Sequence, residues 1–340
     1  MDTTTRKIAD YAAGVRFADI TDETIHAATQ RLLDSLGCAL GAYNCEPAQI
    51  GRRLASGQTA GKYPGRVLCF GERIPAEAAS FINTTMIRNL DFNDRYPGGH
   101  PSDCLGALLA LSGATHIDGK RFLTAMIVIY EIFARLSDAT RLSRRGWDQG
   151  YAIAIATAAG ICNLLGLSVE HAADAVGIVA TSSLPLRVTR SGELTSWKNV
   201  ATAYAARNGV FAALLAAEGM SGPGNAFEGR NGLFENVTGA FDLAPVSEKR
   251  RRLSNATRAD EILAYRDQRT TRGLGGAGTA HKSSAECLAR DRSIHVEVHL
   301  VRDRQRAREV GSADARDGGS QFALYLCSRA RGRADPRKLI

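Results

Sequence analysis

"FLTAMIVIYEIFARL" (residues 122–136) is the most apolar run of the chain, and it decides the fold class. A membrane-spanning helix needs about 20 apolar residues. This run is shorter and contains Glu131 and Arg135. We therefore predict a helix buried in a protein core, and we expect no partnership with a membrane.

The segments on either side of this run show the same helical spacing. In residues 21–43, apolar side chains recur near a period of 3.6 residues, and Thr21 is a candidate N-cap followed by two acidic residues. Segments rich in small residues, which let helices approach closely, continue the pattern at 75–90, 104–117, 151–166, 168–183 and 198–219. We predict a mainly α protein in which residues 1–248 form a large all-helical domain. "GRVLCFG" (65–71) is the one short strand signal in this part.

The character of the sequence changes after residue 248. Residues 1–248 hold 22 Lys and Arg against 24 Asp and Glu, whereas residues 249–340 hold 21 against 11. The last quarter is rich in Arg and weak in apolar periodicity, although "SIHVEVHLV" (293–301) and "QFALYLC" (321–327) alternate like strands. We predict a separate, partly disordered region at 249–340.

Several function classes are not supported by the residues. "GLGGAG" (273–278) fits a dinucleotide-binding pattern but follows a polar stretch instead of a strand. The Arg-rich region has no recognisable nucleic-acid-reading module and almost no aromatic residues for stacking. We predict neither a dinucleotide site nor a nucleic-acid partner.

The seven cysteines are widely spaced and form no C-x-x-C pair, so we expect buried thiols and neither a disulfide framework nor a metal site. The first residues, "MDTTTRKIADYAAG", show no apolar segment of a secretory signal. We expect a cytoplasmic protein.

The loop "NLDFNDRYPGGHPSD" (89–103) interrupts two apolar helical segments with charged and turn-forming residues. Asp91, Asp94 and His100 together offer a base, an acid and orienting partners. The alternative is a structural loop, in which the aspartates cap neighbouring helices and His100 merely precedes a proline. Composition alone leaves both interpretations open.

Two further clusters have the same ambiguity. In residues 184–209, Arg187, Arg190 and Lys198 precede an Ala-rich helical segment, at whose positive end Lys198 would help to attract an anion. A solvated surface lysine is the alternative. In "RRGWDQGYA" (144–152), Trp147 fits core packing and Asp148 fits a helix cap.

Taken in order, five motifs carry a family resemblance. They are "LLDSLGCALGAY", "LDFNDRYPGGHPSD", "GALLALSGATHIDGKRFLTAMIVIYEIFARL", "RRGWDQGYAIAIATAAGICNLLGLS" and "SWKNVATAYAARNGVFAALLAAEGMSGPGNAFEGRNGLF". Up to about residue 245, the chain resembles the MmgE/PrpD family, which includes 2-methylcitrate dehydratase and cis-aconitate decarboxylase. The resemblance implies an all-helical domain joined to a smaller α/β lid domain, a homodimer, a small di- or tricarboxylate substrate, and no cofactor.

The resemblance also implies site residues. Asp91 and Asp94 match the first and last acids of the family's L-D-F-D-D-T motif, His100 matches the His of H-P-S, and Lys198 matches the Lys before the Ala-rich helix. His281 is a match for the His of the lid. Two positions depart from the decarboxylase, because Arg95 replaces a Thr and Asp148 replaces a His.

The form of the motif at Asp148 resembles that of dehydratase-like members, which favours a 2-methylcitrate dehydratase type of lyase over a decarboxylase. An isomerase remains a further alternative. In such a site, His100 or Asp91 would handle protons, and Lys198, with Arg95 nearby, would hold substrate carboxylates and developing charge. The remaining substrate-binding candidates are Asp94, Asp148 and His281. The residues leave open which group is the base and which the acid.

The resemblance fails in residues 249–340. The family's Lys-Tyr-Pro and H-S-L-P-Y segments of the lid are missing there. We interpret this region as a truncated or degenerate α/β lid, for which a shifted reading frame is one explanation. A catalytically inactive helical remnant is therefore the alternative to an enzyme.

Overall fold

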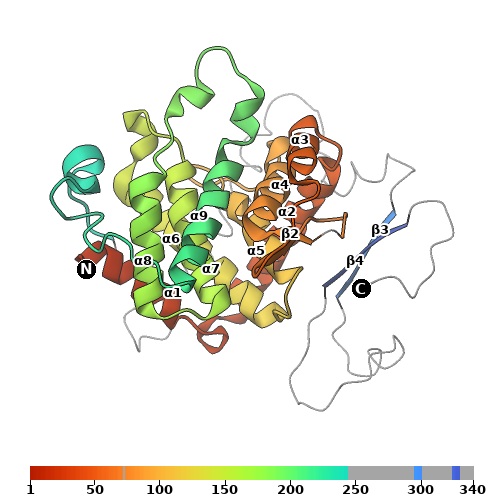
Figure 1. Cartoon of the computed structure of the whole chain (residues 1–340), viewed down its shortest axis with the longest axis horizontal. Helices are drawn as coiled ribbons and strands as arrows, with labels where there is room; N and C mark the ends of the chain where they lie inside the picture. Colours follow the sequence, from red (N-terminus) through yellow and green to blue (C-terminus); the bar gives the residue numbers. More distant parts are fainter. Residues whose placement is uncertain (72, 244–294, 301–323, 330–340) are drawn as a thin grey trace.

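The structure is a computed structural model that describes residues 1–71, 73–243, 295–300 and 324–329 (Figure 1). Within these residues the chain is mostly helical, as predicted. The α-helices are α1 (Thr3–Gly14), α2 (Asp22–Gly41), α3 (Glu46–Ala55), α4 (Ala76–Asn89), α5 (Leu105–Ser112), α6 (Gly119–Thr140), α7 (Gly150–Leu165), α8 (Val169–Ser182) and α9 (Ala201–Ala217). Short helical turns are η1 (Phe17–Asp19), η2 (Pro101–Cys104), η3 (Leu142–Arg145), η4 (Arg187–Arg190), η5 (Ser196–Asn199) and the π-helical η6 (Phe234–Thr238).

The apolar run at 122–136 lies in α6 and is buried, as predicted. Ile129 and Phe133 are completely buried. Glu131 and Arg135 are buried as well and form an ion pair one helical turn apart, with side chains only 5% and 6% exposed. Because an isolated charge is costly in such surroundings, each of the two makes the burial of the other tolerable.

Helix α7 lies in the middle of the helical core and packs against α6, α8 and α9 (Figure 1). All its residues from Gly150 to Leu164 are buried. A Cβ atom on Gly209 of α9 would lie 2.6 Å from the carbonyl oxygen of Ala154 in α7. A Cβ on Gly160 of α7 would lie 2.3 Å from Cγ1 of Ile129 in α6. These helices therefore approach each other where one of them has no side chain.

The start of α2 follows its sequence signal. Thr21 caps α2, and its hydroxyl accepts a hydrogen bond from the backbone N–H of Thr24 at 3.2 Å. The helix expected from residue 198 is one correction. Lys198 lies in η5, and α9 begins only at Ala201, because Val200, with φ −122°, interrupts the helical backbone between them.

The strands are short. β1 (Pro64–Arg66) pairs antiparallel with β2 (Arg73–Pro75). The strand signal at 65–71 was thus partly wrong, because the chain turns after Arg66 and the pairing partner was not predicted. β3 (His295–Leu300) and β4 (Leu324–Arg329) pair antiparallel, with His295 opposite Arg329, which confirms strands in the two alternating segments. The rest of the predicted lid remnant lies outside the described residues.

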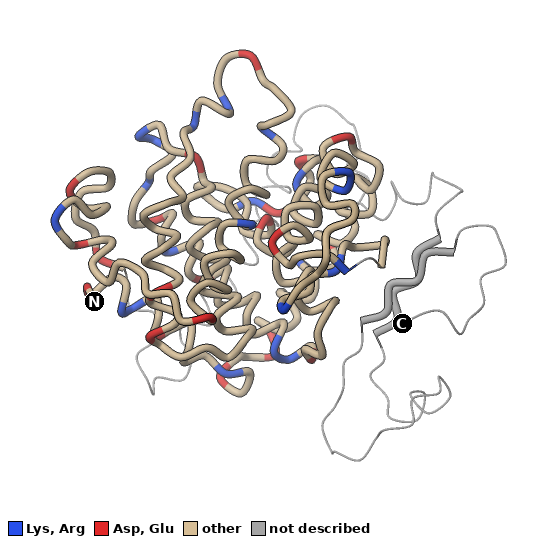
Figure 2. The backbone as a smooth tube through the Cα atoms, viewed as in Figure 1, with Lys and Arg blue, Asp and Glu red and all other residues tan. Residues whose placement is uncertain are grey.

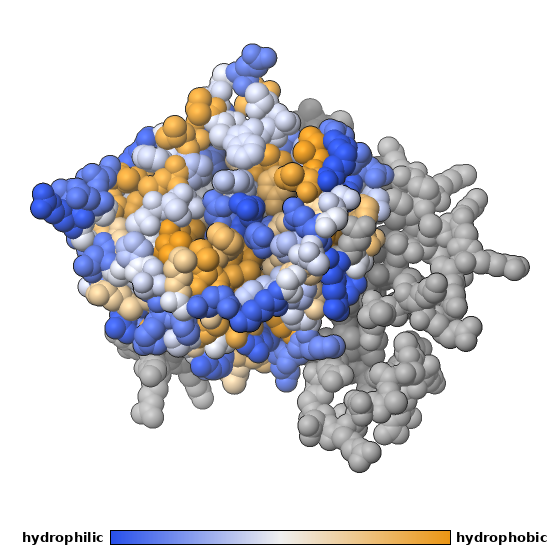
Figure 3. Space-filling model, viewed as in Figure 1, coloured by the Kyte–Doolittle hydropathy of each residue, from blue (hydrophilic) through white to orange (hydrophobic). Residues whose placement is uncertain are grey.

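Charged residues lie mostly on loops and outer helices, whereas the central helices carry few of them (Figure 2). Helix α9 leaves apolar side chains exposed, with Tyr204 45% and Phe211 47% accessible. Apolar side chains gather on the face of the molecule where α9 lies (Figure 3). In the described part of the chain, no helix combines the length and apolar character that a membrane span requires. The five cysteines described are free, and Cys38, Cys104 and Cys162 are buried.

We expect Gly209→Ala to lower the free energy of unfolding by about 3 kcal/mol or more, because the new methyl group would push α9 away from the backbone of α7. Gly14→Ala is the matched control, since a Cβ on Gly14, the last residue of α1, would meet no atom within 4 Å. Urea unfolding followed by circular dichroism measures both. Equal stability of the two variants would contradict the close α7–α9 packing.

Candidate functional site

The loop after α4 turns one carboxylate back over the end of that helix. Asp91 has a φ of +57°, in the left-handed region that few residues other than Gly, Asn and Asp adopt. Its backbone N–H donates a hydrogen bond to the carbonyl oxygen of Arg88 at 3.0 Å, which closes the end of the helix. The side chain of Asp91 is 48% exposed.

Three basic groups from three segments meet at Asp91. Arg88, in the last turn of α4, forms an ion pair with Oδ1. Nε2 of His100, at the end of the loop, lies 3.8 Å from Oδ1. Nζ of Lys198, in η5, lies 3.4 Å from Oδ2. The structure therefore brings together Asp91, His100 and Lys198, the three residues predicted to be catalytic.

The imidazole of His100 is held from two sides. Its Nδ1 lies 2.5 Å from the carbonyl oxygen of Asp94, which can only accept a hydrogen bond. Its backbone N–H donates to Oε1 of Gln149 at 2.7 Å. Gly99 makes this second contact possible, because a Cβ there would lie 1.6 Å from the same Oε1 atom. In neutral His100 the proton therefore resides on Nδ1, and Nε2 carries the free lone pair on the side of Asp91.

Two of the predicted substrate-binding carboxylates are buried and hydrogen-bonded to protein groups. Asp94 accepts hydrogen bonds from the backbone N–H of Ser102 at 3.1 Å and from the hydroxyl of Tyr130 at 2.7 Å. Asp148 is completely buried and forms an ion pair with Arg190 of η4. These contacts fix the loop and the start of α7.

The other two predicted substrate-binding residues differ from this pair. Arg95 is exposed and makes no ion pair or side-chain hydrogen bond with any residue that the structure describes. It is therefore near the site in sequence but not part of its contacts. His281 lies outside the described residues.

Three further residues of the site were not predicted from the sequence. In the sequence, Arg88 is one polar position in an otherwise helical segment, and Gln149 belongs to a predicted turn. Asp103 closes the quoted loop, where it is buried and accepts a hydrogen bond from Nδ2 of Asn93 at 2.8 Å. A charged residue on the buried face of a helix one turn before a polar loop was the available signal for Arg88.

The surroundings shift the protonation of both central groups. Burial, and then the positive charge of Arg88, lower the pKa of His100 to about 4, against the opposing negative charge of Asp94. Burial acts to raise the pKa of Asp91, but the hydrogen bond and charge of Arg88 outweigh it and lower the pKa to about 2. At neutral pH the free site therefore presents an uncharged imidazole beside an ionised carboxylate. This pair is able to accept a proton, and Lys198 next to it is able to bind an anion.

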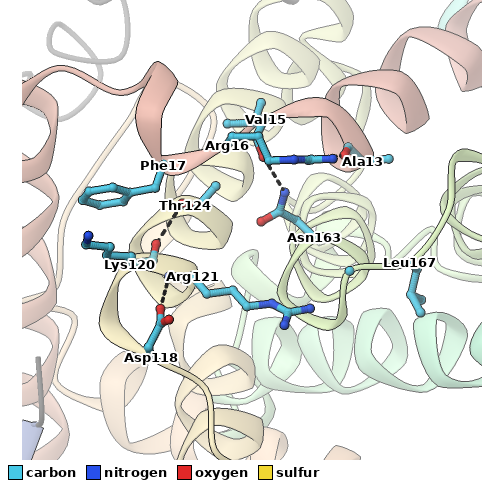
Figure 4. A pocket seen from close by; sticks show the side chains of 11 residues that line it. Ala13, Val15, Arg16, Phe17, Asp118, Lys120, Arg121, Thr124, Asn163 and Leu167 are labelled. Atoms are coloured by element: carbon cyan, nitrogen blue, oxygen red, sulfur yellow. Dashed lines mark hydrogen bonds between the residues drawn. The ribbon is translucent and has the colours of Figure 1, made fainter. Parts of the chain in front are cut away.

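A cavity of about 440 Å³ lies elsewhere, between the start of α6 and the ends of α1 and α7 (Figure 4). The loop that carries His100 contacts α6 through Tyr130 and Asp138, whereas the residues of α6 that line the cavity extend only to Thr124. Two of the cavity's three cations are engaged: Nη1 of Arg16 donates to the carbonyl oxygen of Ala13, and Nζ of Lys120 lies 5.4 Å from the ring centre of Phe17. We therefore do not place the chemistry there.

The described residues include no group of three or more His, Cys, Asp or Glu side chains placed to hold a metal ion. The candidate site is accordingly defined by Asp91, His100 and Lys198 and by the buried residues that support them.

Comparison with known proteins adds the family context. A model of the MmgE/PrpD N-terminal domain matches residues 6–245. The chain is 31% identical to the 2-methylcitrate dehydratase of Escherichia coli K12, over 64% of this chain and 48% of that protein. It is 32% identical to the mitochondrial 2-methylcitrate dehydratase of Yarrowia lipolytica, over 65% and 45%. It is 29% identical to the cis-aconitate decarboxylase-like protein oryM of Aspergillus oryzae, over 68% and 50%. The chain spans about half the length of these relatives.

The lowered pKa of His100 predicts a dependence of stability on pH. The pKa of His100 is about 4 in the folded chain and near 6.5 in the unfolded chain, so the unfolded chain binds this proton more readily. The contribution of His100 to the free energy of unfolding is therefore fully present above pH 6.5 and is lost as the pH falls toward 4. Between pH 7 and pH 4.5, we expect the unmodified chain to lose about 2 kcal/mol more unfolding free energy than His100→Gln. Urea unfolding at both pH values measures the difference, and equal losses would show that His100 titrates normally.

Proposed function

The chain belongs to the MmgE/PrpD family, and from that premise we propose that it is a lyase of the 2-methylcitrate dehydratase type. Its substrate would be a small di- or tricarboxylate, and the chemistry would need no cofactor. The observation that carries the proposal is the meeting of an uncharged imidazole and a lysine at one carboxylate, His100 and Lys198 at Asp91.

Lys198 and His100 carry out different steps of the proposed dehydration. Lys198, whose Nζ lies 3.4 Å from Asp91, binds a substrate carboxylate and stabilises the negative charge that develops on it. Nε2 of His100 removes the proton from the carbon beside that carboxylate. As the carbon–carbon double bond forms, the carbon–oxygen bond breaks, and the imidazolium returns its proton to the departing hydroxyl, which leaves as water.

Substrate binding would improve His100 as a base. A pKa of about 4 makes the imidazole a weak base in the free site. A polycarboxylate brings negative charges beside it, and a nearby negative charge raises the pKa of an imidazole. Asp91 has a pKa of about 2 and stays ionised at neutral pH, so we assign it the role of orienting Lys198 and stabilising the protonated form of His100, and not that of the proton donor.

Proton NMR of the 340-residue chain with 2-methylcitrate, citrate or cis-aconitate tests the proposal. Removal of the proton from the methyl-bearing carbon of 2-methylcitrate, with loss of water, leaves a double bond without hydrogens, so we expect the methyl doublet of the substrate to be replaced by a methyl singlet. We expect His100→Asn to lower the rate by about 10²–10⁴, the usual contribution of a general acid–base residue, and Lys198→Ala to lower it strongly as well. Lys120→Ala, at the distant cavity, is the matched control and should leave the rate unchanged.

Other products in the same NMR experiment would change the assigned reaction. Loss of carbon dioxide from cis-aconitate would replace the dehydratase assignment with a decarboxylase, and interconversion of polycarboxylates without loss of water would replace it with an isomerase. A folded chain that turns over none of the three substrates would contradict the proposal and favour an inactive helical remnant.

We also propose that the chain forms a homodimer through the apolar surface of α9 and the segment before it. Besides Tyr204 and Phe211, this surface exposes Leu194 and Trp197, which are 54% and 44% accessible. A second copy of the chain would remove these side chains from water. Sedimentation equilibrium should give about twice the monomer mass of 36.4 kDa, and Phe211→Arg should give the monomer mass. A monomeric unmodified chain would refute this part of the proposal.

A further inference from the structure

Arg88 is the one strongly buried cation that contacts Asp91 in the described site. Its side chain is 4% exposed, whereas that of Lys198 is 28% exposed. Nη1 of Arg88 forms the ion pair with Asp91, and Nε lies 3.5 Å from Oδ2 of Asp103. A guanidinium keeps its positive charge at any pH at which the protein folds. Arg88 is therefore a fixed charge beneath the groups that face solvent.

Asp103 forms a second ion pair with Arg88. Its side chain is completely buried, and burial raises its pKa to about 6, against the lowering effect of the charge of Arg88. Asn93 joins the two residues, because its Nδ2 donates to Asp103 at 2.8 Å and its Oδ1 lies 3.5 Å from Nη1 of Arg88. Removing the charge of Arg88 would leave the buried carboxylate of Asp103 without this ion-pair partner. The pair therefore fixes the position of the guanidinium.

The charge of Arg88 also acts on His100. The other ionisable groups near the imidazole are Asp91, at 3.8 Å, Asp94, whose carbonyl oxygen it contacts, and Lys198, on the far side of Asp91. The two aspartates favour a charged imidazole. Burial and Arg88 favour the neutral one and prevail. Arg88 is thus the cation that offsets both carboxylates beside His100.

We propose that Arg88, anchored by Asp103, is the positioning residue that keeps Asp91 turned toward Lys198 and keeps His100 uncharged until a substrate binds. The inference deepens the proposed lyase function and rests on it. A purely structural role is the competing explanation, since Arg88 lies in the last turn of α4, where a cation also interacts favourably with the helix dipole.

The experiment is an NMR titration of the histidine side chains of the full chain between pH 8 and pH 5, without substrate. His100→Gln identifies the His100 signal among those of the seven histidines. In the unmodified chain we expect that signal to move little. In Arg88→Met, the loss of the charge should raise the midpoint into the titrated range. Arg88→Lys retains the charge and should keep the signal nearly still.

The control is Arg121→Met, which removes an arginine at the distant cavity and should leave the His100 titration unchanged. If Arg88→Met does not fold, Arg88→Gln removes the same charge and retains hydrogen-bond donors. A folded, uncharged variant in which His100 still does not titrate above pH 5 would overturn the inference. So would an Arg88→Lys chain that titrates like Arg88→Met. Because the readout requires no turnover, a failure of the proposed lyase activity would be seen separately.

Discussion

The close approach of helix backbones is the constraint on which the rest of the structure depends. Gly106 of α5 faces the backbone of Thr84 in α4, where a Cβ would lie 2.3 Å from the backbone nitrogen. The contact of Gly209 with the backbone of α7 has the same character, whereas Gly160 of α7 makes room for the side chain of Ile129 in α6. Because these helices meet without intervening side chains, the end of α4, the start of α7 and the turn before α9 converge. The candidate site is built from these three segments and from the loop that carries Asp91 and His100.

The ion pairs of the site differ from the buried ion pair of the core helix α6. In α6, Glu131 and Arg135 pair with each other in the same helix. At the site, by contrast, two ion pairs join segments that are distant in sequence: Lys198 contacts Asp91, and Arg190 contacts Asp148. Such pairs add little net stability once both charges have been removed from water. Their value lies in fixing the relative positions of the segments, which a proton-transfer site requires.

The sequence predicted the helical core well because burial imposes a period that is visible in one dimension. The buried segments in α2 and α4 to α9 were found in this way, whereas α1 and α3 were not predicted. The sequence predicted that the helix begins at Lys198, whereas α9 begins at Ala201. The periodicity of the apolar residues shows neither the short turn at Lys198 nor the non-helical φ of Val200. Arg88 was missed because it lies inside a helical pattern, and its partner Asp103 lies 15 positions away. The meeting of Asp91, His100 and Lys198 came from the family motifs and not from periodicity.

Charge balance limits what the described residues achieve alone. The site contains the carboxylates Asp91, Asp94, Asp103 and Asp148 and the cations Arg88, Arg190 and Lys198. A di- or tricarboxylate would add two or three negative charges to this excess of acids. Its binding is therefore favourable only if further cations approach the site. The sequence holds its surplus of basic residues in 249–340, where 21 Lys and Arg face 11 Asp and Glu. Residues 249–340 lie mostly outside the described part of the chain, so among the described residues the exposed Arg95 is where we expect part of the balancing charge to originate.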